Sequence, residues 1–450
     1  MPMERMRLLV PEMRELLEAN QVEELKDVIA SFEPIEVAEV FEHFSEDEQL
    51  SLLKDLDLST AAEVFEELHV EEQMRLISGL AHQRAARVLD EMSPDDRADL
   101  FEDLPEELVS RFLALMKQPE AADVRELMKY PSNTAGGLMT TEYASALEEV
   151  TVEEAMRNLR EEAKRLEVVY YLYVADRVGR LVGVVSLKQL VLSDPDRRLS
   201  EVMKSNPVSV QLEMDQEQVA KEVAKYDFLA MPVVDTQGRM RGIVTVDDVV
   251  DVIETEATED MQKMASMEAV DEAYLRVGFF SLARKRIFWL VALLFIETLS
   301  GKVLQIYSGA IEAVVALAYF IPLLTGTGGN AGAQTSTMIV RGLATGEISL
   351  RDGSRVIVKE IFMGLFLGLI LGSFAFGRAY WGEGNMALGL TLGISVVAVV
   401  TMATLAGSLL PIFFRLLRRD PAVMAGPFIT TLVDVASLII YLEIARRLLF

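Results

Sequence analysis

The feature that most constrains this chain is a series of apolar stretches in residues 284–450. They lie at roughly 286–308, 311–340, 357–380, 386–413 and 427–448. A bilayer has a hydrocarbon core of about 30 Å, which about 20 helical residues can cross. Each stretch is long enough, so the sequence predicts a five-helix transmembrane domain at 284–450.

Basic residues around these stretches predict their orientation, because cytosolic loops are enriched in Lys and Arg. Ten basic residues flank one set of ends (Arg284, Lys285, Arg286, Arg341, Arg351, Arg355, Lys359, Arg415, Arg418, Arg419) and four flank the other (Lys302, Arg378, Arg446, Arg447). We therefore expect a multi-pass protein of the cytoplasmic (inner) membrane. Its N-terminus and soluble domains would lie in the cytosol and its C-terminus outside. An odd number of spans fits a homodimer whose axis runs along the membrane normal.

The last apolar stretch carries a carboxylate, Asp434, seven residues after its start. At 1.5 Å per residue, the side chain lies about 10 Å from the cytosolic end of the span. An ionisable group at that depth is costly and usually functional, and no basic residue at helical spacing neutralises it. Two interpretations stay open: a cation pathway through Asp434, or a structural hydrogen bond to Thr430 or Thr431.

Two further carboxylates lie in or near the spans. Glu297 has Lys302 close by along the chain, so an ion pair or interfacial exposure competes with a role in a pore. Glu312 opens the second stretch, where the positive end of a helix favours a carboxylate for structural reasons. The sequence alone assigns neither residue to a pathway.

The second stretch contains a glycine-rich run after Pro322. Its glycines are Gly326, Gly328, Gly329 and Gly332. This composition predicts that the helix is broken or loosened at membrane depth, where irregular backbone is tolerated only if it is buried or lines a watery path. The carbonyls of Gly326 and Gly328 and the amide of Asn330 would then offer oxygen ligands to a hard cation. A phosphate-binding loop is the competing interpretation, but no Walker lysine follows the run.

The net negative charge of the chain lies entirely in its first two-thirds. Residues 1–130 hold 33 acidic and 13 basic side chains, residues 131–275 hold 28 and 15, and residues 276–450 hold 9 and 15. Such an acidic surface repels nucleic acid and attracts cations. A merely solubilising surface is the plain alternative. The membrane half has no HExxH motif and no nucleophile elbow, so we expect no enzyme and no catalytic residues.

The first 130 residues contain a short helical repeat. AEVFEHF (38–44), AEVFEEL (62–68) and ARVLDEM (86–92) recur at a spacing of 24, with related segments between them. The pattern indicates about one helix per 12 residues. Such helices cannot bury a core alone, so the sequence predicts an all-α superhelical N-terminal domain at 1–130.

A second repeat occupies residues 131–258. VADRVGRLVGVVSLKQLV (174–191) aligns with VVDTQGRMRGIVTVDDVV (233–250), and the Asp and Gly residues of the two copies coincide. Each copy is typical of a strand, an Asp/Gly hairpin turn, a strand and a helix. Paired units of this kind resemble tandem CBS modules, which implies an α/β domain over 131–258.

An acidic helix is expected to connect this domain to the membrane, at 244–270. Seven of its side chains are acidic within 14 residues, and like charges at helical spacing repel. A divalent cation bridging them to other carboxylates would relieve the repulsion; a solvated helix is the alternative. The candidate regulatory ligands are Asp95, Asp99, Glu217, Asp227, Asp247, Asp248, Asp251, Glu256, Glu259 and Asp260.

A nucleotide is the other candidate ligand of the cytosolic half. Thr245 and Asp248 fit the G-h-h-T-x-x-D ribose-binding pattern of CBS units, whereas the first copy has Ser186 and Gln189 and lacks the acidic residue. We therefore expect at most one nucleotide site per chain, with ATP as a regulator.

Together these features resemble the MgtE family of magnesium channels. The segments that carry the resemblance are PLLTGTGGNAGAQ (322–334), DPA (420–422), Pro427 with TTLVD (430–434), and YPSNTAGGLMT (130–140). The resemblance implies a homodimer with one magnesium-selective pore on its axis and Asp434 as the central carboxylate. It also implies a connecting helix that closes the pore when cytosolic magnesium draws the acidic domains together.

The chain departs from the family pattern at one position. The family often has Asn before Pro427, but this chain has Gly426. Coordination near Asp434 would then depend on Thr430 and backbone oxygens. The rival is a non-conducting, membrane-tethered magnesium or nucleotide sensor, which would need no carboxylate inside the membrane.

Overall fold

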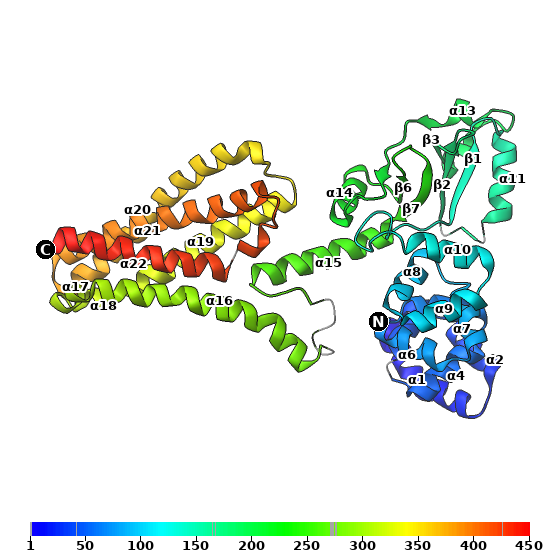
Figure 1. Cartoon of the computed structure of the whole chain (residues 1–450), viewed down its shortest axis with the longest axis horizontal. Helices are drawn as coiled ribbons and strands as arrows, with labels where there is room; N and C mark the ends of the chain where they lie inside the picture. The colour runs from blue at the N-terminus through cyan, green and yellow to red at the C-terminus, as the bar shows by residue number, and fades with distance from the viewer. Residues whose placement is uncertain are drawn as a thin grey trace. The chain divides into compact units, whose positions relative to one another are not determined.

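The computed structural model describes residues 2–41, 43–163, 165–166, 168–270, 274, 277–424 and 426–450. The chain divides into two compact units, Met1–Ile253 and Glu254–Phe450. In Figure 1 the first unit runs from blue to green and the second from green to red.

The first unit begins with an array of short helices (Figure 1). They are α1 (Pro2–Glu18), α2 (Val22–Ile29), α3 (Pro34–Phe41), α4 (Glu46–Asp55), α5 (Leu58–Glu66), α6 (Val70–Gly79), α7 (His82–Leu89), α8 (Pro94–Asp103), α9 (Glu106–Leu115) and α10 (Gln118–Leu127). The repeated aromatic and aliphatic positions, such as Phe41 and Phe65, are buried in one hydrophobic core. The predicted all-α N-terminal domain is confirmed.

The 24-residue repeat also has a polar component. Gln49 donates a side-chain hydrogen bond of 2.7 Å to the Phe41 carbonyl, and Gln73 donates one of 2.8 Å to the Phe65 carbonyl. The third copy has Arg97, whose guanidinium donates to the Leu89 carbonyl at 3.1 Å. The last carbonyls of a helix have no partner within that helix. In each repeat, a buried side chain therefore donates a hydrogen bond to a carbonyl at the C-terminal end of the helix, eight residues earlier in the chain.

The rest of the first unit is the predicted pair of α/β copies. The first contains β1 (Tyr143–Leu147), α11 (Val152–Glu162), β2 (Val168–Ala175), β3 (Leu181–Ser186), α12 (Leu187–Leu192), α13 (Leu199–Val202) and β4 (Lys204–Ser205). The second contains β5 (Val210–Gln211), α14 (Gln216–Tyr226), β6 (Ala230–Val234), β7 (Met240–Thr245) and α15 (Val246–Met264), which continues into the second unit. The sheet orders are β1-β2-β3-β4 and β5-β6-β7, with one parallel and then antiparallel pairings.

The Asp/Gly turns join the two copies. Asp235 Oδ1 accepts hydrogen bonds from the backbone N–H groups of Gln237 and Arg239, both at 2.9 Å. The turn then needs a positive φ at Gly238 (+76°), which glycine adopts without strain. The Leu181 N–H donates to the Gly238 carbonyl at 3.0 Å, so one turn pairs with the other copy's hairpin.

The second unit is helical. Its helices are α16 (Phe279–Ile306), α17 (Ser308–Ala313), α18 (Ala316–Tyr319), α19 (Ile321–Ala344), α20 (Gly353–Glu383), α21 (Met386–Leu416) and α22 (Pro427–Leu449), with short 3-10 turns η1 (Leu350–Asp352) and η2 (Ala422–Met424). Within the described residues, four helical segments are long and apolar enough to cross a membrane: Phe279–Ile306, Leu350–Glu383, Met386–Leu416 and Pro427–Leu449. The second predicted span, 311–340, is instead divided among α17, α18 and α19.

The glycine-rich run does not break its helix, which corrects the sequence-based expectation. α19 is continuous from Ile321 to Ala344, and Pro322 occupies its first turn, where no backbone N–H is needed. The glycines serve packing instead. A Cβ at Gly328 would lie 2.7 Å from Val399 of α21, and one at Gly332 would lie 2.9 Å from Ile429 of α22. Small residues let α19 approach both helices closely.

The glycines of α20 form the packing face that their four-residue spacing predicts. Gly364, Gly368 and Gly372 are buried against α21. A Cβ at Gly368 would lie 2.9 Å from the Cα of Val397, which is backbone and cannot rotate away. The core of the second unit is therefore set by close contact of α19, α20, α21 and α22.

Candidate functional site

Asp434 lies in the second turn of α22, which begins at Pro427. Its side chain is half-buried, and its Oδ1 atom is buried with no hydrogen-bond partner among the described residues. The neighbouring threonines do not satisfy it. Thr430 donates to the Gly426 carbonyl at 3.1 Å, and Thr431 donates to the Pro427 carbonyl at 2.8 Å. The structural alternative, a hydrogen bond from Thr430 or Thr431 to Asp434, is thus not formed.

Helix α19 forms one wall beside Asp434. A Cβ at Gly329 would lie 2.8 Å from Thr430 Cγ2 and 3.6 Å from Asp434 Oδ1, so glycine at this position allows α19 to pack closely against α22. The neighbouring helix α16 carries a second carboxylate, Glu297. The carboxylate is therefore surrounded by packed helices and a second acid, an arrangement that favours a cation as its counter-charge.

The three candidate ligands of α19 fall on different faces. Gly326 and Asn330 are exposed, whereas Gly328 is buried against Val399, Val433 and Ser437. Because α19 is a continuous helix, its glycine carbonyls are engaged in helical hydrogen bonds and are not freed for an ion. The broken helix that was expected to free the Gly326 and Gly328 carbonyls is therefore not formed, and their role as ligands stays a prediction. The Asn330 side chain keeps its oxygen available on the exposed face.

In the first unit, the structure brings together acids from α8 and the start of α15. Asp99 and Asp96 on α8 interact electrostatically with Asp248, Asp247 and Asp251 on α15. Surrounding protein and like charges raise the pKa of Asp99 to about 7 and that of Asp248 to about 6. The same two causes raise the pKa of Asp96. We call these five residues the α8–α15 acidic cluster.

Two glutamates that the sequence analysis missed extend this cluster from α5. Desolvation, with repulsion from Asp96 and Asp251, raises the pKa of Glu67. Desolvation raises the pKa of Glu66 to about 7, although Ser93 donates a backbone hydrogen bond to it at 2.5 Å. Asp96 was also missed, although its i, i+3 spacing to Asp99 on one helix face was a readable signal. The two glutamates carried no local signal, because α5 and α8 are neighbours only in space.

The other predicted regulatory ligands have different surroundings. Asp95 is on α8 but is buried, and Asp227 is an exposed cap of α14 with a φ of +54°. Glu217 pairs with Lys221 at 2.6 Å. Glu256, Glu259 and Asp260 belong to the second unit. Within the described ranges, no three acidic or histidine side chains lie close enough to share one metal ion.

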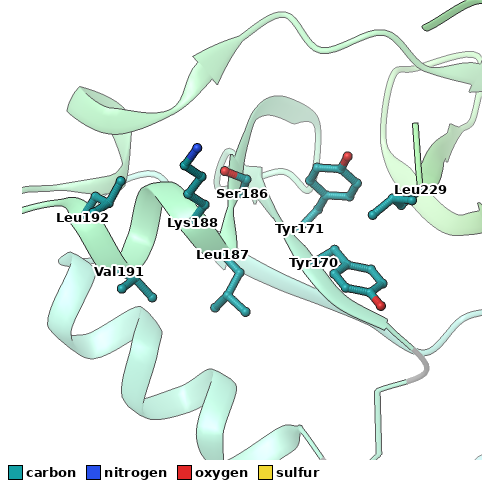
Figure 2. A pocket seen from close by; sticks show the side chains of 8 residues that line it. All are labelled: Tyr170, Tyr171, Ser186, Leu187, Lys188, Val191, Leu192 and Leu229. Atoms are coloured by element: carbon teal, nitrogen blue, oxygen red, sulfur yellow. The ribbon is translucent and has the colours of Figure 1, made fainter. Parts of the chain in front are cut away.

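The predicted ribose-binding pair lies away from two cavities of the α/β domain. Thr245 is fully buried and donates to Asp248 at 2.5 Å. The cavities are next to the first copy's Ser186 instead. One, of about 210 Å³, is lined by Tyr171, Tyr173, Val184, Ser186, Gln189, Lys204, Pro207, Val208, Phe228, Ala230 and Pro232. The other, of about 530 Å³, is lined by Tyr170, Tyr171, Ser186, Leu187, Lys188, Val191, Leu192 and Leu229 (Figure 2).

These two cavities are adjacent, because Tyr171 and Ser186 line both of them, and we call the two together the recess. Its smaller part has aromatic walls from both copies, Tyr171 and Phe228, which suit a planar ring. Lys204 lines the smaller part and Lys188 the larger, so cations are available at both ends for an anionic group. Figure 2 shows Lys188 and Ser186 beside the two tyrosines. A mostly apolar recess with a few polar groups is the usual form of a small-molecule site.

Three family models match the chain in succession. The model described as the MgtE intracellular N domain matches residues 32–133, and the CBS domain model matches residues 135–194 and 199–255. The MgtE model, described as a divalent cation transporter, matches residues 321–444.

Curated relatives cover most of the chain. The magnesium transporter MgtE of Thermus thermophilus is 46% identical over 326 residues, which are 72% of this chain and 72% of that protein. The magnesium transporter MgtE of Enterococcus faecalis is 40% identical over 325 residues, 72% of this chain and 70% of that protein.

Two solved structures have a similar fold. One is the soluble part of a magnesium transporter, with 33% identity and a TM-score of 0.54, covering 57% of this chain and 99% of that chain. The other is the cytosolic domain of the Mg2+ channel MgtE in complex with ATP, with 38% identity and a TM-score of 0.51, covering 53% of this chain and 98% of that chain.

The raised pKa values predict how the cluster affects stability. An acid with a raised pKa binds a proton in the folded state that the unfolded chain has released. Stability from Asp99 is therefore present at low pH and is lost as pH rises from about 4 to about 7. We expect Asp99→Asn to raise the melting temperature at pH 8 by roughly 2 °C and to flatten its fall between pH 5 and 8.

The measurement is a thermal melt of the purified protein, followed by circular dichroism at both pH values. Glu107→Gln is the matched control, because Glu107 is exposed on α9 and is not among the groups that raise the pKa of Asp99. A parent and an Asp99→Asn variant with the same pH dependence would contradict the assignment.

Proposed function

The chain belongs to the MgtE family of magnesium transporters, and from this premise we propose that it is a magnesium-selective channel whose pore contains Asp434. The observation that carries the proposal is the buried Asp434 Oδ1, which has no hydrogen-bond partner among the described residues. A carboxylate inside a membrane-spanning helix is costly unless a counter-charge or a functional ion meets it. A permeating divalent cation supplies that charge.

The chemistry of magnesium suits such a site. Mg²⁺ sheds its water reluctantly and demands near-octahedral oxygen geometry. In a homodimer with its axis along the membrane normal, two Asp434 carboxylates would face one another and hold a largely hydrated ion through its waters. Asn330, on the exposed face of α19, would offer a further oxygen. The Thr430 and Thr431 hydroxyls have lone pairs left after donating to their own helix.

The rival function is a non-conducting membrane sensor, which would need no carboxylate in α22. Cobalt and other first-row divalent ions share oxygen ligands with magnesium, so oxygen ligands and geometry alone exclude them poorly. We propose passive flow, with the first unit in the cytosol, the C-terminus outside and the cytoplasmic membrane as the location.

The α8–α15 acidic cluster would supply negative feedback. Solvent still reaches Asp96 and Asp99, so a hydrated cation has access to the repelling pair of helices. Cytosolic magnesium would neutralise the cluster and hold α8 and the start of α15 together. Without magnesium, like-charge repulsion would separate them. The connecting helix α15 would carry this change toward the pore, which would be closed at high magnesium and open at low magnesium.

A regulatory nucleotide is a second ligand with a specific observation in its favour. The recess around Tyr171 and Ser186 combines aromatic walls with Lys188 and Lys204. We propose that the adenine of ATP occupies the smaller part, between Tyr171 and Phe228, and that its phosphates interact with the lysines. This moves the site from Thr245 and Asp248 to the first copy, where Gln189 replaces the acidic residue.

The pore assignment predicts that Asp434→Asn lowers magnesium flux at least tenfold, because the amide is isosteric but carries no charge. Uptake into proteoliposomes containing a magnesium-sensitive dye measures it. Glu312→Gln is the control, since Glu312 is exposed on α17 and should leave the flux unchanged. Equal flux in the parent and Asp434→Asn, with both variants equally folded by size-exclusion chromatography, would defeat the assignment.

The nucleotide assignment predicts that Phe228→Ala weakens ATP binding about tenfold, by removing roughly 1–2 kcal/mol of ring stacking. Isothermal titration calorimetry of the detergent-purified chain measures the affinity. Lys204→Ala should weaken ATP more than adenosine, whereas Lys225→Ala, which removes an exposed lysine outside the recess, should weaken neither. Absence of ATP binding to the parent would remove the proposal.

A further inference from the structure

Within the second unit, two ion pairs that share Lys263 join the last turn of α15 to the loop between α21 and α22. Lys263 Nζ lies 2.6 Å from Glu259 Oε1 on the same helix and 2.8 Å from Asp420 Oδ2 in the loop between α21 and α22. The lysine and both acids are only partly exposed, at 26%, 33% and 34% of their side-chain surfaces. Shielding of this degree makes an ion pair stronger than one on an open surface.

Apolar contact and a glycine complete this junction. Met264, next to Lys263, packs against Val340 of α19 and Ala422 of η2. Gly426 lies against the Met264 carbonyl oxygen, and a Cβ there would collide with it. Gly426 also has a φ of +53°, which side chains rarely adopt. This chain therefore has glycine before Pro427 because the end of α15 occupies the space that an Asn side chain would need.

The chain after α15 is held in place as well. The turn at Ser266 has a φ of +55°. The Gln262 side chain accepts a hydrogen bond from the Val270 backbone N–H at 2.5 Å and donates one to the Val270 carbonyl at 3.2 Å. Lys285 of α16 donates to the Ala269 carbonyl at 2.5 Å. The end of α15 is thus fastened to α16 as well as to the α21–α22 loop.

Charge explains what Lys263 does in this junction. It is the only basic residue of α15, whose neighbouring residues 254–260 include Glu254, Glu256, Glu259 and Asp260. Without it, the carboxylates of Glu259 and Asp420 would face one another and repel. A lysine side chain is charged at physiological pH, and the two carboxylates beside Lys263 stabilise that charge.

We propose that Lys263 is a built-in bridge that takes the place of a divalent cation between Glu259 and Asp420. It keeps the last turn of α15 attached to the α21–α22 loop at every magnesium concentration. Magnesium-dependent movement of α15 then takes place before Glu259, and Glu259 is a structural partner rather than a regulatory ligand. The consequence for gating rests on the proposed function; the attachment itself does not.

The attached loop leads directly to the pore helix. Gly426 precedes Pro427, the first residue of α22, and Asp434 follows in the same helix. A pull on the fastened end of α15 would therefore act on the start of α22. Lys263 is a positioning residue in this scheme, since it touches the loop and not the ion.

A crosslinking experiment tests the attachment directly, because the chain has no cysteine. Met264→Cys and Ala422→Cys are introduced together into the full chain in proteoliposomes. A short bismaleimide is added in EDTA or in 20 mM Mg²⁺, and the crosslinked peptide is quantified by mass spectrometry. We expect equal yields in the two conditions. A yield that falls severalfold in EDTA would overturn the proposal.

A charge exchange tests the role of Lys263. In the double-cysteine background, Asp420→Lys alone should lower the crosslink yield severalfold, because two lysines then repel. Adding Lys263→Glu restores a lysine between two carboxylates and should restore the yield. If the exchange does not restore it, the ion pair is not the bridge. The crosslink yield does not depend on ion flux. A chain that conducts no magnesium would therefore contradict the proposed function, and the crosslinking result could still be interpreted.

Discussion

The second unit depends on one constraint: a carboxylate that has no hydrogen-bond partner among the described residues lies in a helix long and apolar enough to span a membrane. The hydroxyls of Thr430 and Thr431 are committed to carbonyls of their own helix. Packing then determines what can reach Asp434. Glycines at positions 328, 329 and 332 let α19 lie against α21 and α22 closely enough to form a wall beside the carboxylate. The glycines that were predicted to break the helix thus help to build the site, because their lack of side chains lets α19 pack closely against α21 and α22.

The first unit uses the same physical principle, like-charge repulsion, at a solvated junction. Carboxylates of α8 and α15 face one another, and desolvation, together with repulsion between like charges, raises the pKa of Asp99 and Asp248. At the other end of α15, the repulsion between Glu259 and Asp420 is already relieved by Lys263. The two ends of α15 therefore differ. The acids at its start repel the acids of α8, whereas Glu259 at its end is paired with Lys263. This difference suits a helix that moves at its start and is held at its end.

The sequence predicted those parts of the fold that local patterns encode. The 24-residue spacing of apolar segments gave the helical array, and the aligned Asp/Gly turns gave the α/β pair. The glycines of α20 gave a packing face. The break in α19 was predicted wrongly, because glycine is a weak helix former in water, whereas in this unit neighbouring helices fill the space beside each glycine. The division of residues 308–320 into α17 and α18 was also missed, since it has no distinct periodicity.

The candidate sites followed the same rule. Asp434 could be found from sequence because a single acid in an apolar stretch is conspicuous. Asp96, Glu66 and Glu67 could not be grouped with Asp248, because they are distant along the chain and meet only after α5, α8 and α15 have packed. The recess around Tyr171 was missed for a related reason: its wall takes Phe228 from one copy and Ser186 from the other. The Lys263 bridge depends on a loop more than 150 residues away.

Magnesium conduction is the central claim, and the reversal potential of the parent channel tests it most directly. The purified chain is reconstituted in a planar bilayer with a magnesium gradient and an impermeant anion. Passive, magnesium-selective flow predicts a current whose reversal potential shifts by about 30 mV for each tenfold change in the gradient, as for any two-charge process. A bilayer with protein present but no magnesium current, or a current whose reversal potential ignores the gradient, would contradict the account.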